Sequence, residues 1–122
     1  MTNEKPLVGI NVLIVEDDFY LASDEKSALE RAGARVIGPC RDADEAAGLA
    51  ALERVDCAVV DVNLGDGPSF TFAQILNRQG VPFVFVTGYD QALIPPELGA
   101  MQRLEKPIRD RDLVAAVARA CR

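Results

Sequence analysis

Short apolar runs separated by helix-like segments constrain the fold of this chain more than any other feature of the sequence. Three runs are continuous rather than alternating with polar residues: "INVLIVE" from Ile10, "CAVVD" from Cys57 and "VPFVFVT" from Val81. Continuous apolar strands are typical of a parallel sheet that helices cover on both faces. Two weaker runs, "ARVIG" from Ala34 and "MQRLEK" from Met101, predict further strands nearer the sheet edges.

Helical patterns fill the intervals between these runs. Capping residues, glycine stops and apolar periodicity predict helices from about Asp18 to Gly33, Asp42 to Arg54, Ser69 to Gly80 and Leu113 to Ala120. Pro95 and Pro96 forbid a long helix between Tyr89 and Gly99, so a short helical turn and a loop are expected there. A β-α unit repeated five times predicts an α/β domain with a doubly wound parallel sheet.

Length and composition predict one domain. The 122 residues are enough for a hydrophobic core, and no linker, repeat or second domain is visible, so residues 1–122 are expected to form a single domain without an output domain. The chain is 49% hydrophobic and shows neither a leader segment nor an 18-residue apolar run, which predicts a cytoplasmic protein without a membrane partner. With 19 acidic and 13 basic residues, the net charge of −6 argues against a nucleic-acid partner.

Histidine and cysteine usage narrows the possible chemistry. Histidine is absent, which excludes Ser-His-Asp hydrolases and metal sites that need histidine ligands. The three cysteines, Cys40, Cys57 and Cys121, are widely spaced and form no CxxC motif. Neither a disulfide framework nor a zinc cluster is therefore predicted, and the thiols are expected to be inert.

Polar side chains follow four of the five predicted strands. They are Glu16 and Asp17 after the first strand, Asp61 after the third, Thr87 after the fourth and Lys106 after the fifth. In an open parallel sheet, functional groups gather outside the carboxyl ends of the strands. We therefore expect these side chains to meet in one hollow that is open to solvent.

Three carboxylates at close quarters repel one another, and a divalent cation relieves that repulsion. Oxygen ligands without histidine or cysteine favour a hard ion such as Mg²⁺. Thr87 and Lys106 are not needed to hold Mg²⁺, but a hydroxyl and an ammonium group suit an anion that binds beside it. A metal ion and an anion beside a carboxylate indicate phosphoryl transfer.

Taken together, these motifs resemble the response-regulator receiver domain of bacterial two-component signalling. The resemblance extends from about Gly9 to Arg122 and rests on Glu16-Asp17, Asp61, Thr87 and Lys106-Pro107 in their order and spacing. It implies a flavodoxin-like (βα)5 fold with strand order 2-1-3-4-5. It also implies a stand-alone regulator that catalyses only its own phosphorylation and dephosphorylation and signals through contacts with an unknown downstream protein.

The resemblance assigns a role to each motif residue. Asp61 would accept a phosphoryl group from a histidine kinase or phosphotransfer protein. Mg²⁺ would be bound by Asp17 and Asp61 directly, by Glu16 largely through water, and by the backbone carbonyl of Asn63. Thr87 and Lys106 would bind the phosphoryl oxygens, and the Lys106-Pro107 peptide bond would be cis.

Two departures from the common receiver pattern concern the aromatic residue that responds to phosphorylation, which is called the switch residue here. The aromatic residue that usually lies three positions before the lysine is replaced by Arg103. The stretch "PFVFVTGYD" resembles the signature of FAT GUY receivers, which lack that aromatic residue and work with kinases of the HWE type, although Val86 replaces the expected alanine. We hypothesise that Tyr89 acts as the responsive aromatic residue instead.

Other interpretations of single motifs remain open or fail. Asp61 alone could be a turn or helix-cap residue. The stretch "DVNLGDG" resembles the start of an EF-hand calcium-binding loop, but the match is incomplete. Asp66 and Phe72 occupy the positions at which an EF-hand needs glycine and glutamate. Asp18 is expected to cap a helix rather than bind metal. The alternative function is a Mg²⁺-dependent phosphoryl-transfer or nuclease-type enzyme, such as a TOPRIM-like domain. Asn63 counts against a TOPRIM-like domain, because that chemistry needs an acid at this position, and so does the acidic surface.

The hypothesis on Tyr89 predicts a local change on phosphorylation. Amide hydrogen exchange of residues 87–100 is expected to differ with and without a phosphoryl mimic, because Gly88 gives the loop that carries Tyr89 conformational freedom. Identical protection with and without the mimic would contradict this role for Tyr89.

Overall fold

The fold is a five-stranded parallel sheet with helices on both faces. The computed structural model describes residues 5–61, 71–87 and 102–121. The strands are β1 (Asn11–Val15), β2 (Arg35–Cys40), β3 (Cys57–Asp61), β4 (Phe83–Thr87) and β5 (Gln102–Glu105). They lie in the order β2-β1-β3-β4-β5, and every neighbouring pair is parallel. The predicted fold class and strand order are thus confirmed.

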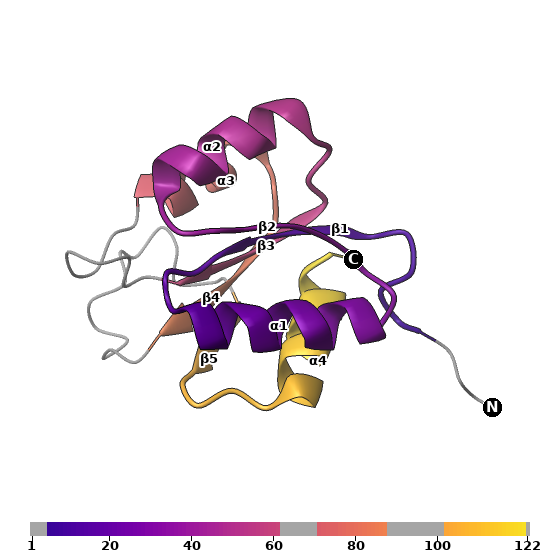
Figure 1. Cartoon of the computed structure of the whole chain (residues 1–122). Coiled ribbons are helices and arrows are strands. Elements are labelled where there is room, and N and C mark those ends of the chain that lie inside the picture. The colour runs from indigo at the N-terminus through magenta and orange to yellow at the C-terminus, as the bar shows by residue number, and fades with distance from the viewer. Residues whose placement is uncertain (1–4, 62–70, 88–101, 122) are drawn as a thin grey trace.

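Four helices in the described parts of the chain form the outer layers. They are α1 (Phe19–Arg31), α2 (Ala43–Leu52), α3 (Thr71–Gln79) and α4 (Asp110–Ala120). Figure 1 shows α2 and α3 on one face of the sheet and α1 and α4 on the other. The fifth predicted β-α unit had its short helical turn between Tyr89 and Gly99, which lies outside the described residues. Ser69, the predicted start of the third helix, also lies outside them.

Two separate hydrophobic cores explain why the strands are continuously apolar. In β1, Leu13 and Val15 point into the core under α2 and α3, whereas Val12 and Ile14 point into the core under α1 and α4. All four side chains are fully buried. Because successive side chains of a strand face opposite ways, the middle positions of a strand covered on both sides are all buried and favour apolar residues.

Side-chain caps fix where two of the helices begin. The Asp18 carboxylate accepts a hydrogen bond of 3.0 Å from the Leu21 amide, and Asp42 accepts one of 2.8 Å from the Glu45 amide. Both aspartates were predicted as caps, and such a cap typically contributes about 1 kcal/mol to stability.

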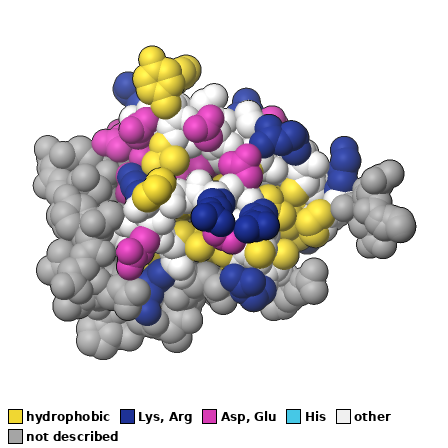
Figure 2. All heavy atoms as spheres, turned by 90° about the horizontal axis from the view of Figure 1, so that it is seen from below, with side chains coloured by type: hydrophobic (Ala, Val, Ile, Leu, Met, Phe, Trp, Pro, Cys, Tyr) yellow, Lys and Arg dark blue, Asp and Glu magenta, His cyan; other side chains and the backbone are white. Residues whose placement is uncertain are grey.

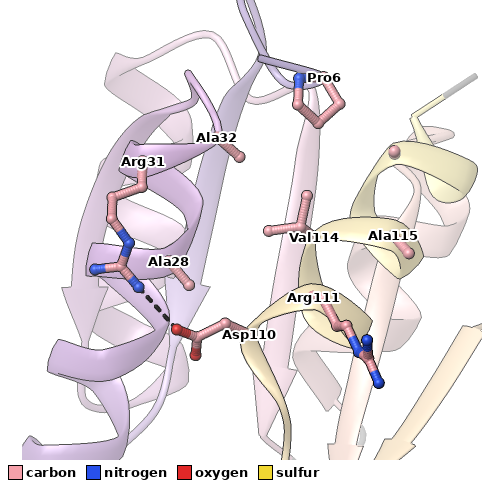
Figure 3. A pocket seen from close by; sticks show the side chains of 9 residues that line it. Pro6, Ala28, Arg31, Ala32, Asp110, Arg111, Val114 and Ala115 are labelled. Carbon is pink, nitrogen blue, oxygen red and sulfur yellow. Dashed lines mark hydrogen bonds and ion pairs between the residues drawn. The ribbon is translucent and has the colours of Figure 1, made fainter. Parts of the chain in front are cut away.

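Helices α1 and α4 lie side by side over one face of the sheet. The Arg31 guanidinium and the Asp110 carboxylate join them by an ion pair of 2.7 Å across a groove floored by small apolar residues (Figure 3). Both charged side chains are more than half exposed, so the pair stabilises the contact only weakly.

Seen from the side of α1 and α4, the described surface mixes basic, acidic and apolar side chains (Figure 2). Within the described ranges, no helix is long and apolar enough to cross a lipid bilayer.

Candidate functional site

Strand ends bring the predicted polar residues to one edge of the sheet. Asp61 ends β3 opposite Val86 of β4, and Thr87 ends β4 one residue later. The Lys106 amide donates a hydrogen bond of 3.0 Å to the Thr87 carbonyl, which extends the β4-β5 ladder by one step. The parallel register therefore carries three side chains from three neighbouring strands to the same end of the sheet.

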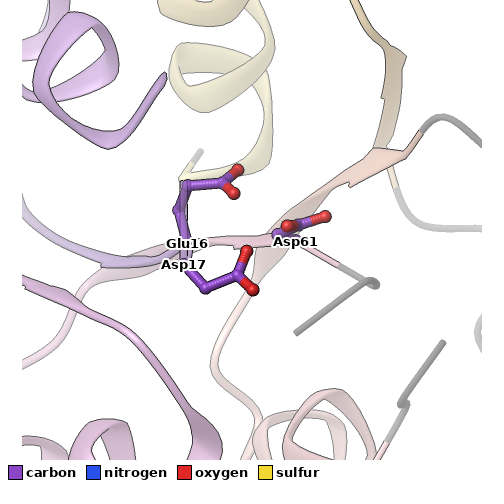
Figure 4. A group of neighbouring side chains, drawn as sticks. All are labelled: Glu16, Asp17 and Asp61. Atoms are coloured by element: carbon purple, nitrogen blue, oxygen red, sulfur yellow. The ribbon is translucent and has the colours of Figure 1, made fainter. Parts of the chain in front are cut away.

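Glu16, Asp17 and Asp61 form a compact acidic cluster (Figure 4). One carboxylate oxygen from each residue lies within 4.8 Å of the others. Glu16 and Asp61 are buried, with 2% and 1% of their surface exposed, whereas Asp17 is exposed. Asp17 is thus the member of the cluster that solvent reaches, and the expected open hollow is covered at Asp61 itself.

Lys106 supplies the positive charge next to this cluster. Its Nζ atom lies 3.5 Å from Asp61 Oδ2 and 3.7 Å from Glu16 Oε1. Partial burial alone would lower the pKa of Lys106, but the charges of Asp61 and Glu16 outweigh it, so the pKa is raised. The ammonium group therefore stays protonated between the two buried carboxylates.

One ammonium group does not neutralise both carboxylates. Burial raises the pKa of Glu16 to about 8, helped by a hydrogen bond with Asp61 and by the charge of Asp61. Glu16 Oε2 accepts a hydrogen bond of 3.2 Å from the Asp18 amide, whereas Glu16 Oε1 is buried without a hydrogen bond from the described residues. Clustered oxygen ligands with an unsatisfied buried oxygen suit a hard divalent cation, so these three residues could hold Mg²⁺.

The structure describes only one of the three remaining predicted site residues, Thr87, Asn63 and Tyr89. Thr87 is described, and it is buried at the end of β4 with 1% of its surface exposed. Asn63 and Tyr89 lie outside the described residues. The Lys106-Pro107 peptide bond is cis, as the resemblance implies. Arg103 lies in β5 opposite Phe85 of β4 and is half-buried.

Two aromatic side chains beside the cluster were not predicted as site residues. Phe19 and Tyr20, in the first turn of α1, are 76% and 79% exposed, and their rings meet edge to face with centroids 5.5 Å apart. Phe19 also lines a hollow of about 420 Å³ that Glu16 and Asp17 border. The sequence signal was available, since two adjacent aromatic residues follow the helix cap directly.

Glu25 is a second buried acid that the sequence interpretation missed. It lies on the inner face of α1, one turn from Ala22 and Leu29, and only 3% of its surface is exposed. Among the described residues, neither of its carboxylate oxygens has a hydrogen-bond partner. Burial raises the pKa of Glu25 to about 8, and the charge of Asp61 adds to the shift. Its position on the apolar stripe of the helix was the signal.

Comparison with known proteins places these features in a family. Residues 12–118 match the family model described as the response regulator receiver domain. The transcriptional regulatory protein PdtaR of Mycobacterium tuberculosis is 29% identical over 120 residues, which are 95% of this chain and 58% of that protein. The phyllosphere-induced regulator PhyR of Methylorubrum extorquens is 30% identical over 117 residues, 93% of this chain and 44% of that protein. The chain thus spans about half the length of these relatives.

Solved structures show the same likeness. The response regulator PhyR of Brucella abortus superimposes with a TM-score of 0.81 at 26% identity, covering 98% of this chain and 49% of that one. The non-phosphorylated HemR receiver domain of Leptospira biflexa gives a TM-score of 0.77 at 29% identity and covers 92% and 94% of the two chains. The match to HemR spans nearly the whole of both chains.

The burial of Glu25 predicts a stability that falls with pH. Unfolding restores the ordinary pKa of 4.5, so the native state holds a proton that the unfolded state releases between about pH 4.5 and pH 8. The contribution of Glu25 to the free energy of unfolding is fully present below pH 4.5 and is lost as the pH rises toward 8. Glu25→Gln is therefore expected to stabilise the protein by up to about 4 kcal/mol at pH 8, and by much less at pH 5.

Urea unfolding at the two pH values, without Mg²⁺, measures this difference. Glu30→Gln is the matched control, because Glu30 is exposed on the same helix, and it is expected to change stability by no more than about 0.5 kcal/mol. An equal gain from Glu25→Gln at both pH values would contradict a buried protonated carboxyl group.

Proposed function

Because this chain belongs to the response regulator receiver domain family of two-component signalling, we propose that it accepts a phosphoryl group on Asp61 from a histidine kinase or a phosphotransfer protein. The proposal rests mainly on the side chains that surround Asp61. Its carboxylate lies 3.5 Å from the Lys106 ammonium group and belongs to the same acidic cluster as Glu16 and Asp17. Receiver domains are regulatory proteins rather than classical enzymes, so the chain would act only on its own phosphorylation and dephosphorylation.

In the proposed reaction, a carboxylate oxygen of Asp61 attacks the phosphorus atom of a phosphohistidine. The phosphorus–nitrogen bond breaks, and its electron pair stays on the leaving imidazole nitrogen. The Thr87 hydroxyl would donate a hydrogen bond to a phosphoryl oxygen, and Lys106 would bind another through its ammonium group. These residues orient the phosphoryl group and balance its charge while the bond is transferred.

A divalent cation fits the same residues. Glu16, Asp17 and Asp61, with the backbone carbonyl of Asn63, would hold Mg²⁺. When bound, Mg²⁺ supplies positive charge to the phosphoryl oxygens, which carry the charge of a loose transition state. The fit is supported by the buried Glu16 Oε1 without a hydrogen bond and by the raised pKa of Glu16, since both describe carboxylates that lack enough positive charge.

Phosphorylation of Asp61 would redistribute the charges around Lys106. The modification adds roughly one negative charge at pH 7 to a residue that is 1% exposed. Lys106 lies between Asp61 and Glu16, at 3.5 and 3.7 Å, and its side chain is 31% exposed, so it has room to move toward the new charge. A local charge change of this kind can bias a two-state element, for which we propose Tyr89 as the responsive aromatic residue.

The exposed pair Phe19 and Tyr20 supports a protein as the phosphoryl donor. Large aromatic side chains exposed next to a reactive site are typical of protein–protein contacts. Their position beside the acidic cluster would let a donor protein bind α1 while its phosphohistidine enters the hollow. The FAT GUY-type signature further favours a kinase of the HWE type as that donor, and the signal would then pass to a downstream protein by direct contact.

The acceptor role predicts a specific loss in Asp61→Asn. Incubation with Mg²⁺ and a small acyl phosphate is expected to give one alkali-labile phosphoryl group per wild-type chain and none in Asp61→Asn. The variant should be at least as stable as the wild type without Mg²⁺, because it removes one of two adjacent buried carboxylates without changing the volume.

Asp18→Asn is the matched control for this experiment. Asparagine caps helices as well as aspartate does, so this variant should fold and accept the phosphoryl group normally. Intact mass and thermal melting measure both properties. Full labelling of Asp61→Asn would contradict the acceptor assignment, and multiple-turnover cleavage of nucleic acid would favour the nuclease alternative.

A donor-docking role of α1 predicts different effects with protein and small donors. The double variant Phe19→Ala, Tyr20→Ala is expected to slow phosphotransfer from a histidine kinase by roughly tenfold or more, since exposed aromatic side chains supply much of the binding energy at such contacts. Labelling by a small acyl phosphate should change less than about twofold. Leu52→Ala tests a comparably exposed apolar residue on α2 and should leave both rates unchanged. Equal slowing with both donors would contradict docking.

A further inference from the structure

Two of the three cysteines form a thiol pair at the amino end of the sheet. Cys57 is the first residue of β3 and has no exposed surface, whereas Cys121 caps the C-terminal end of α4 and is half-buried. Cys57 belongs to the hydrophobic core under α1 and α4, and Cys121 packs against that core. Residues 64 positions apart in sequence thus share one site.

The sulfur atoms lie within reach of the same short stretch of backbone. The Cys121 thiol lies 3.8 Å from the Asp56 carbonyl, and the Cys57 thiol lies 3.9 Å from the Ala58 carbonyl. Cys121 Sγ thus approaches the carbonyl group of the residue that directly precedes Cys57. Cys121 is therefore held against the residues that flank Cys57, rather than merely being near it.

The environments of the two thiols differ in a way that assigns them unequal reactivity. A hydrogen bond from Cys57 lowers the pKa of Cys121, although burial and the charge of Asp56 act against it. The pKa of Cys57 is raised by the neighbouring Cys121 and by burial. Because the thiolate is the nucleophile, the partly exposed Cys121 is the thiol that an oxidant would meet first. Cys57 then lies in place to attack the oxidised sulfur.

We propose that Cys121 and Cys57 are a redox pair, which hydrogen peroxide converts into an intramolecular disulfide between the end of α4 and the start of β3. The Cys121 thiolate attacks one peroxide oxygen, the oxygen–oxygen bond breaks, and water leaves after protonation, which gives a sulfenic acid on Cys121. The Cys57 sulfur then attacks the Cys121 sulfur, the sulfur–oxygen bond breaks, and the Cys57 proton leaves with the hydroxide as water. Two thiols and one peroxide thus give one disulfide and two waters.

This site is separate from the acidic cluster. Cys57 and Asp61 are the two ends of β3, and four residue steps along a strand correspond to about 13 Å. The disulfide would link the last helix to a central strand and close a long loop of chain, which is expected to raise the melting temperature by roughly 5 °C or more. Formation of this disulfide does not depend on phosphoryl transfer, so a result that contradicts one proposal leaves the other unaffected.

Peptide mapping tests the pair directly, because trypsin places each cysteine on its own peptide. Cleavage after arginine leaves Cys57 in residues 55–78, Cys121 in residues 120–122 and Cys40 in residues 36–41. Folded protein would be treated with a small excess of hydrogen peroxide, its remaining thiols alkylated, and the digest analysed without reduction. The expected product joins peptides 55–78 and 120–122, disappears on reduction, and leaves Cys40 alkylated.

Three variants separate the steps. Cys121→Ser is expected to abolish the linked peptide. Cys57→Ala should abolish it too and leave a sulfenic acid on Cys121, giving at least tenfold more dimedone adduct than the wild type. Cys40→Ala is the control and should keep the linked peptide, because Cys40 lies in the other core, under α2 and α3. Linkage of two 120–122 peptides, sulfinic acid on Cys121 of the wild type, or no oxidation of the folded protein would overturn the proposal.

Discussion

Two buried carboxylates that share one ammonium group set the physical constraint on this protein. Glu16 and Asp61 are both almost fully covered, and a single charge on Lys106 lies between them at 3.7 and 3.5 Å. Burial of a charge without compensation is costly, and burial, together with a hydrogen bond and the charge of Asp61, raises the pKa of Glu16 to about 8. A cation at this edge of the sheet would supply the compensating charge that the single ammonium group lacks.

The sheet makes this constraint possible because its two cores hold β1 and β3 rigidly from both sides. Side chains such as Leu13 and Ile14 face opposite layers of helices, and neither layer can shift without exposing one of the cores. The carboxyl ends of the strands are the first positions at which polar groups become possible. Glu16 directly follows the buried residues Val12–Val15 of β1, and Asp61 is the last residue of β3, which is buried throughout. Their separation is thereby fixed by backbone pairing rather than by flexible side chains.

Much of this architecture could be predicted from the sequence, for identifiable reasons. The continuous apolar runs specified β1, β3 and β4, and Asp18 and Asp42 specified two helix starts, because strand burial and capping are local properties. The grouping of strand-end side chains followed from parallel topology alone. The near-complete burial of Asp61 could not be predicted in this way, because it depends on how neighbouring elements cover the end of the strand.

Glu25, Phe19 and Cys121 show where local patterns stop being informative. An acid on the inner face of α1 and an aromatic residue on its outer face both contradict the usual partition of side chains, so their positions in the helix pattern were a signal, but that pattern does not say what surrounds them. Cys121 gains a partner only because α4 ends beside the start of β3, 64 residues away in sequence. One strand thus has a carboxylate at its far end and a thiol at its beginning, each next to a group from a distant element. Because β3 is buried throughout, the apolar side chains of Ala58, Val59 and Val60 separate the two sites.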